Sequence, residues 1–261
     1  MLKNIMKASV VVAFAWLALH VASAAQAAEW GSIKGRILVD GKPAALAPIN
    51  AGTDPFCAMK KPVSEAIIIG KDNALVNAVV YLRLATGQKV EINPEYDEAL
   101  KKAVELDNKN CAFVPHVTLV RVGQTLNIKN SDPTGHNTNL SVFSLNPIVP
   151  AGQTITTKAT VAAPLPTPVA CNIHPFMRGY ILSQDHPYMT VADNDGKFEI
   201  KNIPVGEHEF QFWHEAAGYL KTVKMKGAAT DARGRAKLKI AAGQTLDLGD
   251  IKVPAAVLKA Q

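Results

Sequence analysis

Several absences narrow the classes of protein that this sequence can encode. It contains no C-x-x-C-H run, which excludes a c-type haem. Aromatic residues make up 6% of the chain and are not interleaved with a basic stripe, so nucleic-acid binding has little support. No Ser–His–Asp set or pair of carboxylates stands out, which leaves hydrolase chemistry without local support. After residue 28, no apolar run approaches the length of a membrane span.

The start of the chain has the pattern of a secretory signal peptide over residues 1–27. Lys3 and Lys7 form a basic start, a short apolar core follows, and Ala25-Gln26-Ala27 is an A-x-A cleavage site. The alternative is an uncleaved membrane anchor. Cleavage would leave a secreted or periplasmic protein without a transmembrane helix.

Cysteine is scarce, and its three copies all lie beyond the signal peptide. An oxidising compartment favours pairing of two cysteines. If Cys171 holds a metal, Cys57 and Cys111 are left as a disulfide pair. Closing that loop would contribute about 4 kcal/mol to stability on the chain-entropy model. The alternative is that Cys171 itself pairs with another cysteine.

Most of the remaining chain reads as short strands between turns, which predicts an all-β fold. Residues 32–39 alternate polar and apolar, and Asp195-Gly196 is a strong hairpin signal. One short helix is expected as an insertion near 94–106. There, Asn93 can cap the helix and Pro94 suits its first position.

The run CNIHPFM at 171–177 places a thiol, an imidazole and a thioether within seven residues. Two imidazoles and a thiolate, with a long axial thioether, form the electron-transfer copper geometry. Cys171, His174 and Met177 supply three of these groups. His136, 35 residues upstream of Cys171 in the run NSDPTGHN, is the candidate for the fourth.

The pattern N-x-D-x-x-x-H-N followed by C-x-x-H-P-F-M-R-G resembles the cupredoxins, the blue copper electron carriers. The ligand loop is most similar to the amicyanin-like subgroup, in which two residues also separate His from Met. The resemblance implies a Greek-key β-sandwich that binds one copper ion, cycling between Cu(I) and Cu(II). The residues concerned are His136, Cys171, His174 and axial Met177 as ligands, Asn137 as the link between ligand loops, and Pro175 and Phe176 in the apolar patch around an exposed edge of His174.

A longer stretch, roughly 66–220, is similar to the family labelled methylamine-utilisation protein. The shared features are F-x-P-H-V near 113–117, the copper motif, D-x-P-Y near 185–188 and F-W-H-E near 212–215. That family joins a cupredoxin domain to a transthyretin-like, carboxypeptidase-regulatory-like sandwich. The expected organisation is therefore an N-terminal β segment at 29–110, a copper domain at 111–187 and a regulatory-like domain at 188–256.

These features predict an exported carrier of single electrons, not an enzyme, which exchanges electrons with a redox protein. A redox enzyme would need an open copper position, which Met177 fills, and a zinc site would want no thioether. The main alternative is a binding or scaffold module whose C-terminal sandwich contacts polysaccharide or a protein partner, with copper structural or lost. His116 reads as an ordinary strand histidine, with an extra metal role as the alternative.

Overall fold

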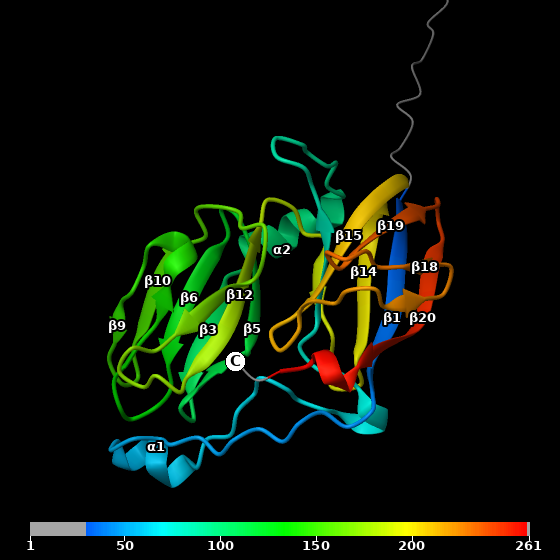
Figure 1. The fold of residues 1–261 in the computed structure, drawn as a ribbon. Helices are drawn as coiled ribbons and strands as arrows, with labels where there is room; N and C mark the ends of the chain where they lie inside the picture. Colours follow the sequence, from blue (N-terminus) through cyan, green and yellow to red (C-terminus); the bar gives the residue numbers. More distant parts are fainter. Residues whose placement is uncertain (1–29, 260–261) are drawn as a thin grey trace, which may run out of the picture.

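The computed structural model describes residues 30–259 and confirms an all-β fold. Two β-sandwiches lie side by side, one from the middle of the chain and one from its two ends (Figure 1). The signal peptide predicted at 1–27, with its alternative of a membrane anchor, falls outside the described residues. Among the residues described, no helix is long and apolar enough to cross a membrane.

The terminal sandwich is built from both ends of the described chain. One sheet has the order β14-β1-β20, and the other has the order β13-β2-β15-β16 with β19 also paired to β15. The strands are β1 (Trp30–Asp40), β2 (Val79–Arg83), β13 (Met189–Val191), β14 (Lys197–Pro204), β15 (Gly206–His214), β16 (Gly218–Tyr219), β19 (Arg235–Ile240) and β20 (Thr245–Pro254), with β17 (Lys224–Met225) and β18 (Ala228–Ala229) as a separate pair. Alternating apolar residues of β1, such as Ile33 and Ile37, are fully buried between the sheets.

The central sandwich has two four-stranded sheets, in the orders β10-β6-β3-β4 and β5-β12-β11-β8. Its strands are β3 (Val104–Lys109), β4 (Ala112–Val114), β5 (Val117–Arg121), β6 (Thr125–Asn130), β8 (Asn139–Leu140), β10 (Thr154–Lys158), β11 (Thr167–Ala170) and β12 (Arg178–Gln184), and β7 (His136–Asn137) pairs separately with β9 (Ile148–Val149). Its core contains Leu106, Phe113, Ile128 and all three cysteines.

Strand pairing corrects the expected division of the chain. The segment 29–110 is not a unit of its own, because β1 pairs with β14 and β20, and β2 pairs with β13 and β15. The last strand of that segment, β3, instead pairs with β6 of the central sandwich. The boundary expected at 110 therefore lies earlier, between β2 and β3, whereas the one expected at 187 falls between β12 and β13, where the chain passes from the central to the terminal sandwich. Strands far apart in sequence complete one another's sheets, which a reading of consecutive segments does not detect.

The predicted helix near 94–106 is shorter than expected. A 3-10 turn at Pro94–Tyr96 leads into α2 (Asp97–Lys101), and Asn93 caps the turn by accepting a hydrogen bond from the Glu95 amide. The Gln124 side chain donates to the carbonyl oxygens of Ala99 and Lys102, which satisfies the end of the helix. The chain then enters β3, so residues 104–106 are strand. A second short helix, α1 (Pro55–Lys60), carries Cys57.

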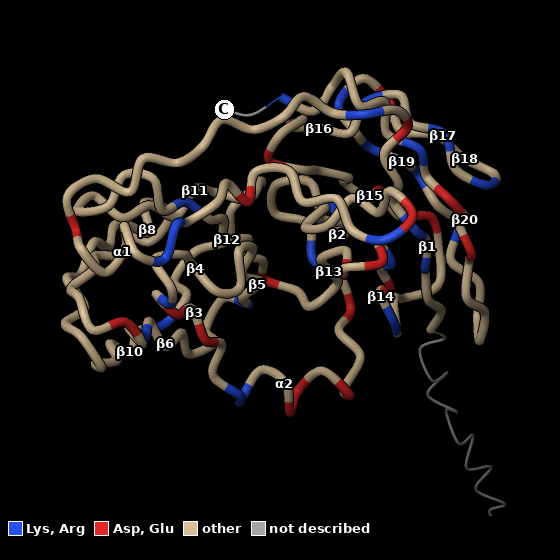
Figure 2. Tube along the Cα trace, turned by 90° about the horizontal axis from the view of Figure 1, so that it is seen from below, with Lys and Arg blue, Asp and Glu red and all other residues tan. Residues whose placement is uncertain are grey.

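The two sandwiches meet through a small apolar cluster. Val79 and Tyr81 of β2 and Trp213 of β15 pack with Val117 of β5 and Leu182 of β12. Figure 2 shows acidic and basic residues interleaved along β17–β20 at the far end of the terminal sandwich. The interface is therefore apolar at its centre, and the charges of that far end lie away from it.

Candidate metal centre

Three ligand atoms meet inside the central sandwich. The Nδ1 atoms of His136 and His174 are 3.0 Å apart, and the Cys171 Sγ lies 4.0 Å from the first and 3.8 Å from the second. A point in the plane of this triangle lies about 2.1 Å from all three atoms, within the range of metal–nitrogen and metal–sulfur bonds. Cys171 is a free thiol and, like His136, is fully buried. The triangle therefore has the size of a trigonal metal site.

The turn between β11 and β12 holds two of these groups in place. The Met177 amide donates to the His174 carbonyl oxygen, and the Cys171 amide donates to that of Met177. Within the loop, the His174 amide donates to the Cys171 Sγ at 3.3 Å. The loop is thus closed at its base and folded around the sulfur atom.

Asn137 joins the strand that carries His136 to this loop. Its Oδ1 accepts hydrogen bonds from the amides of Asn172 at 2.7 Å and Ile173 at 3.1 Å. Asn137 is 3% exposed, so no water replaces these bonds readily. The spacing between His136 and the thiol loop is therefore fixed by direct hydrogen bonds.

The outer nitrogen of His136 faces a carboxylate. His136 Nε2 lies 3.0 Å from Asp132 Oδ2, and both side chains are buried. Burial lowers the pKa of His136 below its usual value, although Asp132 acts in the opposite direction. A neutral ring that donates Nε2–H to Asp132 keeps the lone pair on Nδ1, the nitrogen that faces Cys171.

The outer nitrogen of His174 also faces a carboxylate, that of Asp54. Their Nε2 and Oδ2 atoms are 3.5 Å apart. Residues 50–54 line a surface pocket together with His174, Ile173, Pro175 and Phe176. The His174 residue as a whole is only 5% exposed. The resemblance implied an exposed edge of this ring, with Pro175 and Phe176 around it, and the structure corrects the exposure.

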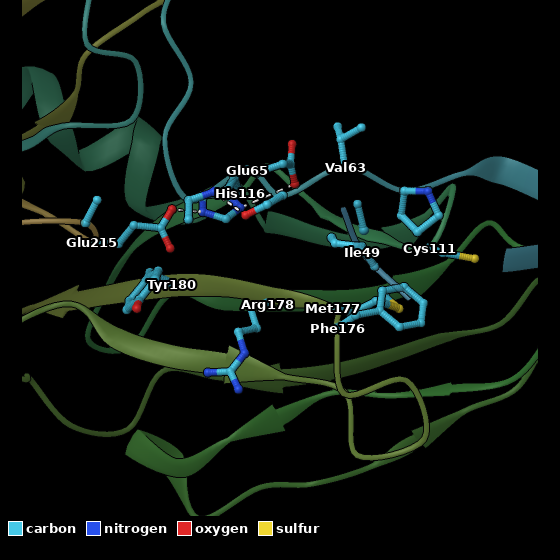
Figure 3. A pocket seen from close by; sticks show the side chains of 15 residues that line it. Ile49, Val63, Glu65, Cys111, His116, Phe176, Met177, Arg178, Tyr180 and Glu215 are labelled. Carbon is cyan, nitrogen blue, oxygen red and sulfur yellow. Dashed lines mark hydrogen bonds and ion pairs between the residues drawn. The ribbon is translucent and has the colours of Figure 1, made fainter. Parts of the chain in front are cut away.

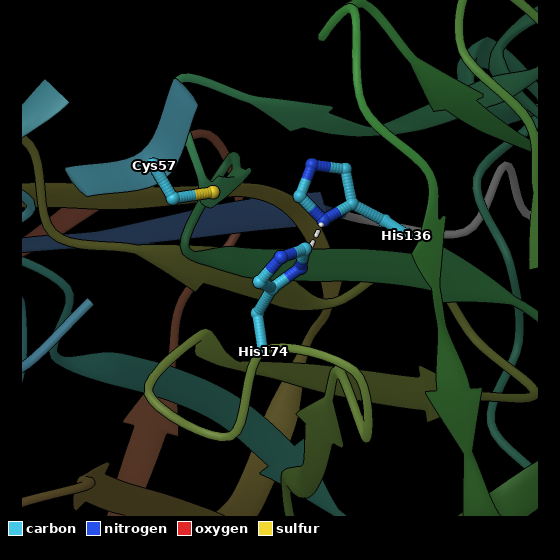
Figure 4. Close-up of side chains that lie close together, drawn as sticks. All are labelled: Cys57, His136 and His174. Carbon is cyan, nitrogen blue, oxygen red and sulfur yellow. Dashed lines mark hydrogen bonds between the residues drawn. The ribbon is translucent and has the colours of Figure 1, made fainter. Parts of the chain in front are cut away.

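The disulfide between Cys57 and Cys111 is confirmed, and it borders the site. The Cys57 Sγ and a ring nitrogen of each histidine all lie within 4.8 Å of one another, and Figure 4 shows the sulfur facing both rings. The Cys111 Sγ, a carboxylate oxygen of Asp132 and a ring nitrogen of His136 likewise lie within 4.8 Å of one another. A disulfide sulfur carries no thiolate, so Cys171 is the cysteine in this cluster that can bind a metal as a thiolate.

Met177 is buried at the end of the loop and lines a cavity of about 70 Å³ between the sandwiches. Figure 3 shows Met177, Phe176 and Cys111 at one end of this cavity and His116 between Glu65 and Glu215 at the other. The structure therefore brings Cys171, His136 and His174 into one triangle and places Met177 in the wall beside the disulfide.

His116 has carboxyl groups on both sides. Its Nε2 lies 2.5 Å from Glu215 of the terminal sandwich, and its Nδ1 lies 3.4 Å from Glu65. Burial alone would lower the pKa of His116, but the hydrogen bonds and charges of Glu215 and Glu65 outweigh it and raise the pKa to about 9. The interpretation of an ordinary strand histidine therefore missed an ion-paired junction between the two sandwiches.

Sequence reasoning also missed the two carboxylates at the ligand rings. Asp132 is the aspartate of the motif N-x-D-x-x-x-H-N, four residues before His136. That short spacing could have indicated a contact between the two side chains. Asp54 gave only the signal of a helix cap before Pro55. Nothing local relates Asp54 to a histidine 120 residues further along the chain.

Comparisons with known proteins find partial structural likenesses. A reduced Cu(I) form of an amicyanin variant is 26% identical, with a TM-score of 0.29, over 32% of this chain and 83% of that one. A novel purple cupredoxin from Nitrosopumilus maritimus is 18% identical, with a TM-score of 0.27, over 32% of this chain and 99% of that one. No protein-family model matches the chain, and no curated protein matches it.

Proposed function

We propose that this chain is an exported type 1 copper protein that transfers single electrons. The observation that carries the proposal is the triangle of Cys171 Sγ and the Nδ1 atoms of His136 and His174. Two imidazoles and one thiolate in a plane are the equatorial set of electron-transfer copper sites. Bound copper would supply a one-electron couple between Cu(I) and Cu(II).

The residues present fit copper in their chemistry as well as in their spacing. Both rings offer Nδ1 because Asp132 and Asp54 face the opposite nitrogens. The ligand atoms sit in a buried apolar core, which keeps water away from the metal and fixes the ligands. Fixed ligands change little between two oxidation states, and a small reorganisation favours fast electron transfer.

The finer parts of the proposal rest on the sequence motif. Met177 would be the axial ligand. The terminal sandwich would be the carboxypeptidase-regulatory-like domain, and the partner would be a redox protein. Export rests on the signal peptide predicted at 1–27. An electron carrier, not a catalyst, is the function that this ligand set favours, since a thioether would fill the axial position.

Copper loading followed by a redox titration tests the function. We expect one copper ion per chain and a reversible one-electron couple. The scaffold alternative predicts instead that metal-free protein binds polysaccharide or a protein partner as well as loaded protein does, without a reversible couple. A loaded protein that exchanges no electron would reject the carrier proposal.

A further inference from the structure

A strap, defined as residues 41–66, follows β1 of the terminal sandwich and precedes β2 of the same sandwich. It leaves β1, passes beneath the central sandwich with α1 and returns (Figure 1). Contacts fasten it at several points. Cys57 is disulfide-bonded to Cys111, and Glu65 is ion-paired with His116. The strap is therefore a fixed part of the wall around the candidate metal centre.

Asp54 is the strap residue whose carboxylate faces a ligand ring. Its Oδ1 accepts a hydrogen bond from the Cys57 amide at 2.8 Å, which caps α1. Its Oδ2 accepts a hydrogen bond from the Thr134 hydroxyl at 2.8 Å and faces His174 Nε2 at 3.5 Å. Both carboxylate oxygens thus have defined partners, and the orientation of the carboxylate toward His174 is set by Thr134 and by α1.

We propose that Asp54 is a positioning residue for His174 and that it stabilises the higher oxidation state of a metal held there. This inference rests on the proposed function. Asp54 would hold the ring through Nε2–H so that Nδ1 stays aimed at the triangle, as a carboxylate behind a metal-bound histidine does.

Formal charges give the direction of the effect. Asp132 and Asp54 each place one negative charge beside a ligand ring, and Cys171 would bind as a thiolate. With Cu(II), the metal, thiolate and two carboxylates sum to −1, and with Cu(I) they sum to −2. The buried site is less favourable to the second state because like charges repel more strongly at low dielectric constant. Removing the charge of Asp54 should therefore raise the reduction potential.

The test compares the reduction potentials of copper-loaded wild type, Asp54→Asn, Thr134→Val and Asp250→Asn. Asparagine caps helices as well as aspartate does, so Asp54→Asn removes the charge and keeps α1. Removing such an outer partner lowers metal affinity at least tenfold in comparable sites. If the loss falls on Cu(II), the Cu(II)/Cu(I) affinity ratio drops about tenfold and the potential rises by about 59 mV.

Thr134→Val keeps the charge but loses the hydroxyl that orients Asp54, and should shift the potential in the same direction by less. Asp250→Asn is the matched control, because Asp250 is exposed on β20 of the terminal sandwich. It should leave the potential unchanged. The free energy of unfolding of each metal-free variant should match that of wild type. This match would show that the fold is intact.

The outcomes separate the two proposals. A wild-type protein without a reversible one-electron couple overturns the proposed function and this inference together. A reversible couple with the same potential in wild type and Asp54→Asn overturns the inference alone. A potential that rises equally in Asp54→Asn and Asp250→Asn also overturns it, because the effect would then come from overall charge.

Discussion

The His116 junction predicts that the stability of this protein depends on pH in a specific way. His116 sits between Glu215 of the terminal sandwich and Glu65 of the strap, and its side chain is 5% exposed. The other titratable groups near it are Tyr180, whose ring centroid is 6.4 Å away, and His214. The informative change is Glu215→Gln, which removes the closer carboxyl group and keeps its shape.

The magnitude follows from the pKa of His116. That pKa rises from 6.5 to about 9 on folding. At about 1.4 kcal/mol per unit, charged His116 contributes about 3 kcal/mol to the free energy of unfolding. Because the folded pKa is the higher one, this stability is fully present below about pH 6.5 and is lost as pH rises through about 9. Glu215 is closer than Glu65, so we expect about 2 kcal/mol to disappear in Glu215→Gln at about pH 6.

Urea unfolding at about pH 6 and about pH 10 measures this difference. Fluorescence of Trp213 is a suitable probe, because its ring lies 4.9 Å from that of Tyr180 at the interface between the sandwiches. Wild type and Glu215→Gln should differ at the lower pH and converge at the higher one. A variant with His116→Gln should show neither the loss of stability at high pH nor a further loss at low pH when Glu215→Gln is added. A difference that stays the same at both pH values would refute the ion-pair reasoning.

Two further predictions concern the frame of the candidate site. Asn137→Ala removes the acceptor of the Asn172 and Ile173 amides, which should lower the free energy of unfolding of metal-free protein by about 2 kcal/mol; an unchanged urea midpoint would contradict the role given to Asn137. Replacing Cys57 and Cys111 by serine opens a loop with a sequence separation of 54, and should cost about 4 kcal/mol. Equal stability of this double variant and wild type would contradict the value assigned to the disulfide.

Local sequence patterns predicted where strands and turns occur better than they predicted which strands pair with one another. A turn is present at Asp195-Gly196, where Gly196 has a φ of 74° that glycine adopts without strain, but the hairpin prediction is wrong because the turn joins β13 of one sheet to β14 of the other. The sequence of β1 does not predict its parallel pairing with β20, which lies more than 200 residues away. The helix near 94–106 was overextended because Val104 continues a helical spacing, whereas pairing with β6 makes it strand.

The candidate site divides in the same way. Cys171 and His174 were visible because a seven-residue loop holds them together, and His136 because a turn and a strand precede it. The second carboxyl partner, Asp54, reaches the site only through the path of the strap. Ligand residues that lie close together in the chain can be predicted from the sequence. A carboxylate distant in the chain, such as Asp54, is brought to the site by tertiary structure.

The optical spectrum of protein loaded with one equivalent of Cu(II) tests the central claim most directly. Cys171, the free thiol of the triangle, should give an intense thiolate-to-copper charge-transfer band. The band should be absent in Cys171→Ser, which keeps the two histidines. A wild-type spectrum without the band, or a band that survives in Cys171→Ser, would contradict the account.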